Sequence, residues 1–396
     1  MLFNVHLFVI VICYVVTKRI CIFIGVMNSF STCPASTMDS LMEIDGSILE
    51  GGGQVLRMAI ALSVLQKIPV RIFNIRAGRS KPGLSPQHLK GLEMAREMTG
   101  GQLMGAQQRS MEVTFRPGQL TPGQYLGDTG TAGSVGLIIQ LLLPCALFSS
   151  GPTILDLRGG TNADMAPQID YTTTVFLALL KRFGGFFNYN LFLRGYYPKG
   201  GGKLKVEIPP VKHLTAVEMV DPGSITRIWG TAFTAGNCPF IVSKQMAQAA
   251  ESILKKVSPS VIPCIRQHKE SPDTAVGTAS GIYLFAETNT GCVLAGTALG
   301  RRDLKAEKVG QAAAEELAQA IQSRVCVDSH AQDQVIILMA LAKGTSRVLC
   351  GPITLHTETA IYMAQLMTKA KFTIHKQDTG NNIIECEGIG LENEAL

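Results

Sequence analysis

The feature that most constrains the fold of this chain is a short segment that occurs three times. In each copy a glutamine heads an apolar stretch that ends in Ala-Leu: QVLRMAIAL from Gln54, QLLLPCAL from Gln140 and QVIILMAL from Gln334. Self-similarity of this kind is typical of one supersecondary unit used several times. A fold built from repeated units is therefore the first expectation.

The similarity extends beyond these stretches. RAGRSKPGLSPQHLKGLEMAREMTGG (76–101) and RGGTNADMAPQIDYTTTVFLALLKRFGG (158–185) share an Arg, two small residues, a loop, Pro-Gln, a segment of helical period and Gly-Gly. The third copy matches more loosely, in GPITLHTETAIYMAQLMTKAKFTI (351–374). The pattern predicts units of helix, strand, loop, helix and strand.

The spacing of the copies predicts an inserted domain. The second glutamine follows the first by 86 residues, whereas the third follows the second by 194, an excess of 108. We place the insert at 213–324, which has its own strand patterns (ITRIWGTAF, GIYLFAET, CVLAGTALG) and two helical segments (245–256 and 308–324). We therefore expect a small α+β domain between units two and three.

Together these patterns predict an α+β chain with three repeated α/β units, each a sheet backed by helices. The large domain comprises 38–212 (units one and two) and 325–396 (unit three), with 213–324 as the insert. The hydrophobic content of 46% supplies a large core and excludes a disordered chain. A net charge of +6 suits an anionic substrate but is far below the density of a nucleic-acid coat protein.

The N-terminal segment 1–37 precedes the repeated units and has a different composition. Leu2 to Val16 is a 15-residue apolar run, which is short for a membrane span of about 20 residues. A signal peptide has Lys or Arg before its apolar region, and this run has neither before it. It is either an upstream extension outside the fold or a targeting segment. We expect the extension, with Met38 opening the body and no stable membrane association.

The ten cysteines include no CxxC and no Cys/His cluster, which argues against a zinc site. Their scattered positions favour buried, reduced thiols in a nuclear or cytosolic protein.

Two loops could bind anions. GSILEGGGQVLR (46–57) places three glycines before a helix, between Glu50 and Arg57. Free N–H groups at a helix N-terminus attract anions, although a tight turn alone would explain the glycines. IRAGRSKPGLSPQH (75–88) carries Arg76, Arg79 and Lys81, which suit phosphate oxygens, the alternative being a solvated basic loop.

Two further loops are RGGTNADMAPQIDYT (158–172) and RGYYPKGGGKLKVEI (194–208). In RGYYPKGGGK, aromatic rings and cations surround three glycines, a combination that could hold the end of a single-stranded polynucleotide. A glycine-rich turn without function is the alternative.

As a set, these segments resemble the RNA 3′-terminal phosphate cyclase family. The resemblance runs in order from about Glu43 to the C-terminus through EGGGQVLR, IRAGRSKPGL, GGTNADMAPQIDYT, RGYYPKGGG, DSHAQDQVIILMALAKG and GPITLHTETA. RGYYPKGGG is close to the family signature. A wider relationship to the enolpyruvyl transferases, which are built from a similar unit, would explain the repeats.

The resemblance implies ATP-dependent conversion of an RNA 3′-phosphate into a 2′,3′-cyclic phosphodiester. A histidine attacks the α-phosphate of ATP, AMP passes to the RNA 3′-phosphate, and the neighbouring 2′-OH displaces AMP. The chemistry is sound because adenylylation supplies a leaving group and the ring closure is intramolecular.

By the same resemblance the nucleophile is His356, in TLHT. The other body histidines, at 88, 213, 268 and 375, lie outside the matched motifs. Nucleotide contacts are implied for Gln140, Pro167, His330, Asp333 and Gln334. Animal relatives commonly have Tyr where this chain has His330.

The charged set around phosphates and metal would be Arg57, Arg76 and Arg79, with Glu50 as the one candidate ligand for Mg²⁺. The resemblance also implies RNA 3′-phosphate ends as partners and a nuclear location.

Two alternatives come from other classes. One is the cyclase-like, non-catalytic protein of ribosome biogenesis, which lacks the nucleophilic histidine. The other is an enolpyruvyl transferase, which would need more repeat copies and no insert of 108 residues.

Overall fold

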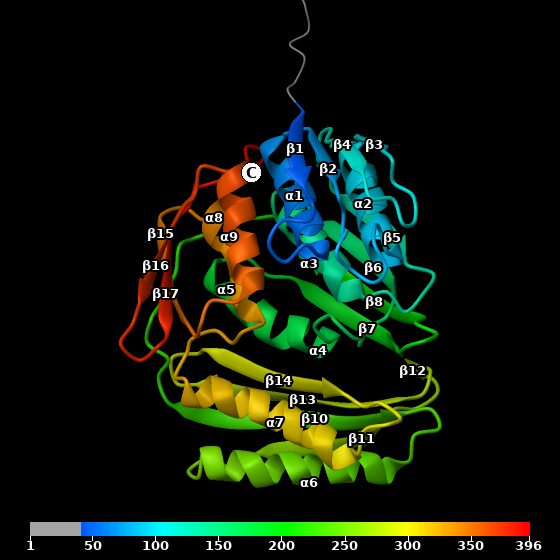
Figure 1. Cartoon of the computed structure of the whole chain (residues 1–396), viewed down its shortest axis with the longest axis vertical. Coiled ribbons are helices and arrows are strands. Elements are labelled where there is room, and N and C mark those ends of the chain that lie inside the picture. The colour runs from blue at the N-terminus through cyan, green and yellow to red at the C-terminus, as the bar shows by residue number, and fades with distance from the viewer. Residues whose placement is uncertain (1–40) are drawn as a thin grey trace, which may run out of the picture. The chain divides into compact units, whose positions relative to one another are not determined.

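The computed structural model describes residues 41–396, so the apolar run Leu2–Val16 and the predicted start at Met38 lie outside the described residues. Helices and mixed sheets make up this part of the chain, which confirms the expectation of an α+β fold (Figure 1). None of its helices combines the length and apolar character that crossing a membrane requires.

Three sheets share one strand order, in which the fourth strand lies between the second and the third. The first sheet is β1 (Met42–Asp45), β2 (Val70–Phe73), β4 (Val113–Arg116) and β3 (Gln102–Met104). The second is β5 (Gly123–Asp128), β6 (Thr153–Gly159), β8 (Gly202–Ile208) and β7 (Asn188–Gly195), extended by β12 (Ala275–Val276). The third is β9 (Glu218–Met219), β15 (Thr345–Cys350), β17 (Asn382–Glu387) and β16 (Lys371–Lys376). In each, the first two strands pair in parallel and the next two pairings are antiparallel, while β12 pairs in parallel with β7.

The helix that directly precedes the second strand of each of these sheets contains one of the Gln-headed segments. These helices are α1 (Gly53–Gln66), α3 (Val135–Leu147) and α8 (Ala331–Leu341). They are apolar on nearly every side and almost wholly buried, as expected of helices packed between layers. The helices predicted at Gln54, Gln140 and Gln334 are therefore confirmed.

A second helix follows the second strand of each sheet. These are α2 (Pro86–Thr99), α5 (Leu177–Arg182) and α9 (Leu355–Met367), with α5 preceded by α4 (Ile169–Tyr171) and the π-helix η1 (Thr172–Phe176). The helices α1 and α9 pack together although they come from opposite ends of the described chain (Figure 1). This contact brings the glycine-rich loop before α1 to the N-terminus of α9.

The fourth sheet has a different strand order, β11 (Cys264–Lys269), β10 (Ile225–Ala235), β13 (Ala279–Thr288) and β14 (Val293–Leu299). The amphipathic helices α6 (Phe240–Val257) and α7 (Ala306–Gln322) pack on it and form a separate apolar cluster. They approach closely at Gly310, where a Cβ would lie 2.1 Å from the carbonyl oxygen of Met246. The strands and helices predicted within 213–324 are confirmed.

Candidate active site

His356 is the second residue of α9, whose start is fixed by side-chain bonds. The Thr354 hydroxyl accepts from the Thr357 N–H at 3.1 Å, and the Gln332 side-chain oxygen accepts from the Thr354 N–H at 3.0 Å. Burial lowers the pKa of His356, and the Asp333 carboxylate only partly opposes this shift. The imidazole is therefore neutral near pH 7, the form in which its nitrogen is nucleophilic.

Gln54 connects His356 to a partly buried carboxylate. Its Nε2 donates to Asp333 Oδ2 at 2.7 Å, and its Oε1 lies 3.1 Å from His356 Nδ1. An amide oxygen only accepts, so His356 Nδ1 must carry the hydrogen. The lone pair then lies on Nε2, which is the form needed for attack on phosphorus.

Arg57 supplies positive charge beside this triad. Burial lowers the pKa of Arg57 to about 10, which leaves the guanidinium charged at neutral pH, and nearby Asp333 favours that charge. Burial raises the pKa of Asp333, while His356 and Arg57 oppose the shift. Arg57 therefore offsets the charge of the Asp333 carboxylate, to which the Gln54 amide donates a hydrogen bond.

A cavity of about 740 Å³ opens beside His356. Its lining includes all the side chains predicted to contact the nucleotide, together with Arg57: Gln140, Pro167, His330, Asp333 and Gln334. The loop 163–168 forms one wall, and Thr297–Leu299 with Arg301 from the fourth sheet forms another. The structure thus brings these residues together, while their roles stay predictions.

The three repeated glutamines meet behind this cavity. Gln54, Gln140 and Gln334 line a second, smaller space of about 40 Å³ together with Arg57 and Asp333. The Gln334 amide donates to the His330 carbonyl at 2.6 Å, while its oxygen is buried and has no hydrogen-bond donor among residues 41–396. The sequence feature that indicates a repeat therefore also marks the site.

His330 is held by a residue of the fourth sheet's helices. Its Nε2 lies 2.7 Å from Glu316 Oε1 on α7, and its ring meets Tyr171 edge to face at 6.0 Å. The hydrogen bond to Glu316 raises the pKa of His330 to about 9, so the ring is cationic near pH 7. A Tyr at this position would carry no such charge.

Glu50, Arg76 and Arg79 lie outside the cavity lining. Glu50 forms an ion pair with Arg79 and its backbone N–H donates to Thr359 of α9 at 3.2 Å. The second oxygen of Glu50 is buried and has no donor in the described part of the chain. Arg76 donates to the Gly83 carbonyl at 2.7 Å.

Glu50 fits a weakly held divalent cation rather than a metal cage. No group of three His, Cys, Asp or Glu side chains between 41 and 396 is arranged to hold a metal. Mg²⁺ commonly binds through one carboxylate and the phosphates of the substrate. The second oxygen of Glu50 could supply the carboxylate ligand in such an arrangement.

Sequence reasoning missed His88, a residue set aside as lying outside the matched motifs. Burial and the charges of Arg57 and Arg76 lower the pKa of His88 to about 3, so it is neutral. A Cβ on Gly53 would lie 2.2 Å from His88 Nε2, so only glycine lets this ring reach the start of α1. The sequence shows Pro-Gln-His at the start of α2, but it does not show that Gly53, Arg57 and Arg76 lie near this histidine.

The loop RGYYPKGGGK leaves Lys199 and Lys203 exposed, but it covers most of Arg194 and buries its first tyrosine. Arg194 is buried between Asp170 and Glu270, and Tyr196 is buried against Phe233, with ring centroids 5.6 Å apart. Tyr197 alone of the two tyrosines is exposed, at 75%. Polynucleotide binding stays a prediction for the exposed part of this loop, and the carboxylates that cover Arg194 come from segments that the loop sequence does not indicate.

Comparison with known proteins is consistent with this geometry. The family model described as RNA 3′-terminal phosphate cyclase matches residues 48–374. An RNA 3′-terminal phosphate cyclase of Drosophila melanogaster is 38% identical over 358 residues, covering 90% of this chain and 99% of the relative.

Archaeal relatives are equally similar. The RNA 3′-terminal phosphate cyclase of Pyrobaculum aerophilum is 40% identical over 349 residues, covering 88% of this chain and 99% of its own. Among solved structures, an EPSP synthase of Acinetobacter baumannii aligns with 89% of this chain and 65% of its own at 15% identity and a TM-score of 0.31.

Proposed function

This chain belongs to the RNA 3′-terminal phosphate cyclase family, and we propose that it acts through a covalent adenylate on His356. The family match and the names of its relatives make it an enzyme, a ligase that forms a phosphoric ester bond on RNA. The observation that carries the mechanistic proposal is the Gln54 bridge, because it leaves the His356 Nε2 lone pair free beside a nucleotide-sized cavity.

The proposed reaction has three displacements at phosphorus. His356 Nε2 attacks the α-phosphorus of ATP, a P–N bond forms and pyrophosphate leaves. An oxygen of the RNA 3′-phosphate then attacks the same phosphorus, the P–N bond breaks and AMP is joined to the RNA. The terminal 2′-OH finally attacks the 3′-phosphorus, which closes the ring and releases AMP.

The residues of this chain serve these steps in distinct ways. Gln54 holds the imidazole with its hydrogen on Nδ1 and accepts more strongly as positive charge develops on the ring. Arg57, Arg76 and Arg79 are proposed to bind the phosphates of ATP and of the RNA end. Gln140, Pro167, His330, Asp333 and Gln334 are proposed to hold the nucleotide. Glu50 would hold Mg²⁺, which neutralises charge on the departing pyrophosphate.

Incubation with ATP labelled at the α-phosphate tests the mechanism. The full chain should retain the label on His356, located by peptide mapping, and His356→Ala should retain none. Three RNA ends should be compared: a 3′-phosphate with a 2′-OH, a 3′-OH, and a 2′-deoxy 3′-phosphate. Only the first should yield a cyclic product. A 2′-deoxy 3′-phosphate end should accumulate as adenylylated strand, and a cyclic product from it would contradict the mechanism.

The same labelling separates the alternative, a non-catalytic cyclase-like protein of ribosome biogenesis. That protein would bind RNA without an adduct. The presence of His356 with its hydrogen-bonded partners Gln54 and Asp333 favours the enzyme.

We also propose that the three sheets with a common strand order are three copies of one unit, and that the insert predicted at 213–324 begins only after β9, because β9 pairs with β15 of the third unit. The shared order and the separate apolar cluster of α6 and α7 support this division. A location in the nucleus, and also in the cytoplasm, is a further proposal, and the free thiols of the seven cysteines in 41–396 suit both reducing compartments. Imaging of the tagged full chain tests it.

A further inference from the structure

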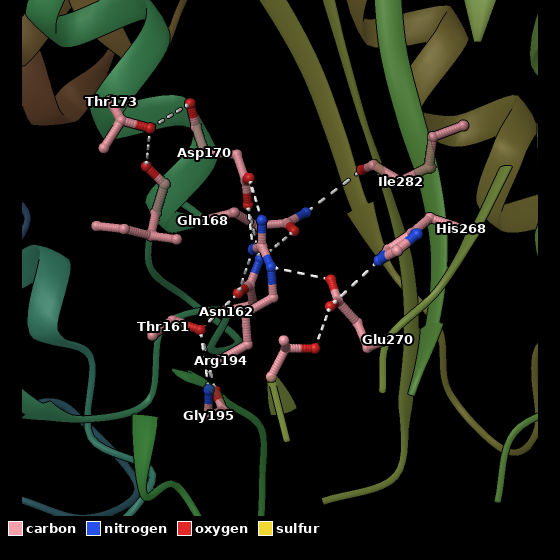
Figure 2. Close-up of polar contacts among 12 residues, drawn as sticks. Thr161, Asn162, Gln168, Asp170, Thr173, Arg194, Gly195, His268, Glu270 and Ile282 are labelled. Atoms are coloured by element: carbon pink, nitrogen blue, oxygen red, sulfur yellow. Dashed lines mark hydrogen bonds and ion pairs between the residues drawn. The ribbon is translucent and has the colours of Figure 1, made fainter. Parts of the chain in front are cut away.

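Arg194, from RGYYPKGGG, is the centre of a buried polar network (Figure 2). Its two terminal nitrogens bind both oxygens of Asp170, at 2.6 and 2.8 Å, and its Nε lies 3.0 Å from Glu270 Oε1. Nη1 also reaches Asn162 Oδ1 at 3.3 Å. The side chain is only 13% exposed, so this cation is occupied by protein groups and is not free for RNA.

Asn162 and Asp170 flank the loop that forms one wall of the nucleotide cavity. The stem of this loop is closed by two bonds, from the Ile169 N–H to the Thr161 carbonyl at 2.9 Å and from Asn162 Nδ2 to Gln168 Oε1 at 2.8 Å. Arg194 contacts a residue on each side of that stem. The residues between, 163–168, line the cavity that also contains His356.

The fourth sheet meets the same network. Glu270 follows β11 and is only 9% exposed, and its second oxygen lies 3.3 Å from His268 Nε2 and 3.1 Å from Thr274 Oγ1. The Arg194 N–H donates to the Thr274 carbonyl at 2.8 Å. Gln168 Nε2 donates to the Ile282 carbonyl of β13 at 3.4 Å (Figure 2). The guanidinium of Arg194 therefore joins the loop stem to Glu270 after β11, and Gln168 joins the same loop to β13.

We propose that Arg194 is a positioning residue that fixes the cavity loop 163–168 for ATP by holding Asp170, Asn162 and Glu270 at once. The inference rests on the proposed function, in which this cavity binds ATP. A wall fixed before binding lowers the ordering cost of binding ATP, so the network acts on ATP affinity rather than on the chemical step.

The geometry requires an arginine. Its planar fork satisfies a bidentate carboxylate while Nε points to a second carboxylate, and the single ammonium of lysine cannot reproduce both contacts. Removing the charge altogether would leave Asp170 and Glu270 without their cation, and this would strongly destabilise the folded protein. Arg194→Lys, which keeps the charge and loses the fork, is therefore the informative variant.

The experiment measures adduct formation from α-labelled ATP at varied ATP concentration. In Arg194→Lys we expect the ATP concentration for half-maximal rate to rise on the order of tenfold or more, as for one or two weakened contacts. The rate at saturating ATP should stay within about threefold, since His356 is untouched. The KM for RNA 3′-phosphate, measured with enzyme already adenylylated, should not change.

Arg347→Lys is the matched control. Arg347 also joins two carboxylates, Glu218 at 2.9 Å and Glu385 at 3.3 Å, but it lies on the third sheet and outside the cavity lining. It should leave the ATP requirement unchanged. Asp170→Asn disrupts the same contact from its other side. If both substitutions act through this contact, the ATP concentration for half-maximal rate in the double variant with Arg194→Lys should be little higher than in either single variant.

Two results would overturn the proposal. One is an unchanged ATP requirement in folded Arg194→Lys and Asp170→Asn, with or without a lower melting temperature, which would mean a purely structural role. The other is a loss of activity confined to the reaction of the adenylylated enzyme with RNA, which would indicate that Arg194 contacts RNA directly. Failure of the proposed function itself looks different, because the unaltered chain would then form no adduct at all.

Discussion

Replacing Gln54 by leucine removes both bonds of the bridge between His356 and Asp333 with little change of volume. The residue is 4% exposed, so water does not readily replace the lost partners. Asp333 loses a donor at 2.7 Å, and His356 Nδ1 loses its acceptor at 3.1 Å. The substitution therefore tests whether the bridge directs the His356 lone pair.

The expected magnitude follows from the charge that develops during attack. As Nε2 bonds to phosphorus the ring becomes cationic, so its bond to Gln54 belongs to the class of hydrogen bonds to charged groups, which contribute about 1.5–3 kcal/mol. A tenfold change in rate corresponds to about 1.4 kcal/mol, so adduct formation should slow by about tenfold to about 150-fold. The free energy of unfolding should fall by about 1–3 kcal/mol because Asp333 stays partly buried without its donor.

The assay is single-turnover formation of labelled adduct at saturating ATP, paired with denaturant unfolding. Gln66→Leu is the control, because it makes the same change on the same helix where the Gln66 Nε2 has no acceptor among residues 41–396. It should leave the rate unchanged. Adduct formation at the unaltered rate in a folded Gln54→Leu protein would refute the idea that Gln54 sets the His356 tautomer.

Three further outcomes are expected. His330→Ala should raise the ATP requirement by about tenfold, which corresponds to about 1–2 kcal/mol of lost contact, and the adduct should still form at high ATP. His330→Tyr should leave the ATP requirement nearly unchanged. Mapping of the label to His330 would contradict this assignment. His88 has its pKa lowered from 6.5 to about 3 in the folded chain, so the free energy of unfolding should fall as pH drops below 6.5, by about 2 kcal/mol at pH 5, and denaturation of His88→Asn across pH should lack this dependence. A chain starting at Met38 should remain soluble and cyclise RNA as the full chain does, and loss of either property would show that the preceding segment is structural.

Much of the secondary structure could be predicted because its signals are local. The Gln-headed stretches specify buried helices by composition alone, and the alternation in ITRIWGTAF specifies a strand. The cavity residues His330, Asp333 and Gln334 could be named because they are contiguous with a recognisable motif. Each of these inferences needed only a short window of sequence.

The contacts that give those residues their chemistry could not be predicted in this way. Gln54 lies 279 residues from Asp333 and 302 from His356, and no periodicity connects such distant positions. Arg194 illustrates the opposite error. An arginine beside tyrosines and glycines suggests a surface that binds RNA, but its carboxylate partners, Asp170 and Glu270, lie in other elements and bury it.

The pairing of α1 with α9 has a consequence for how the protein is made. The helix α1 is apolar on nearly every side, and the helix that covers it follows about 300 residues later. At synthesis rates of about 5–20 residues per second, α1 leaves the ribosome about 15–60 s before its partner. During that interval the face of α1 that packs against α9 stays uncovered, although α2 and α3 leave the ribosome sooner, and this apolar face is a substrate for chaperones. Because His356 arrives with α9, a chain that terminates before this helix lacks the proposed nucleophile.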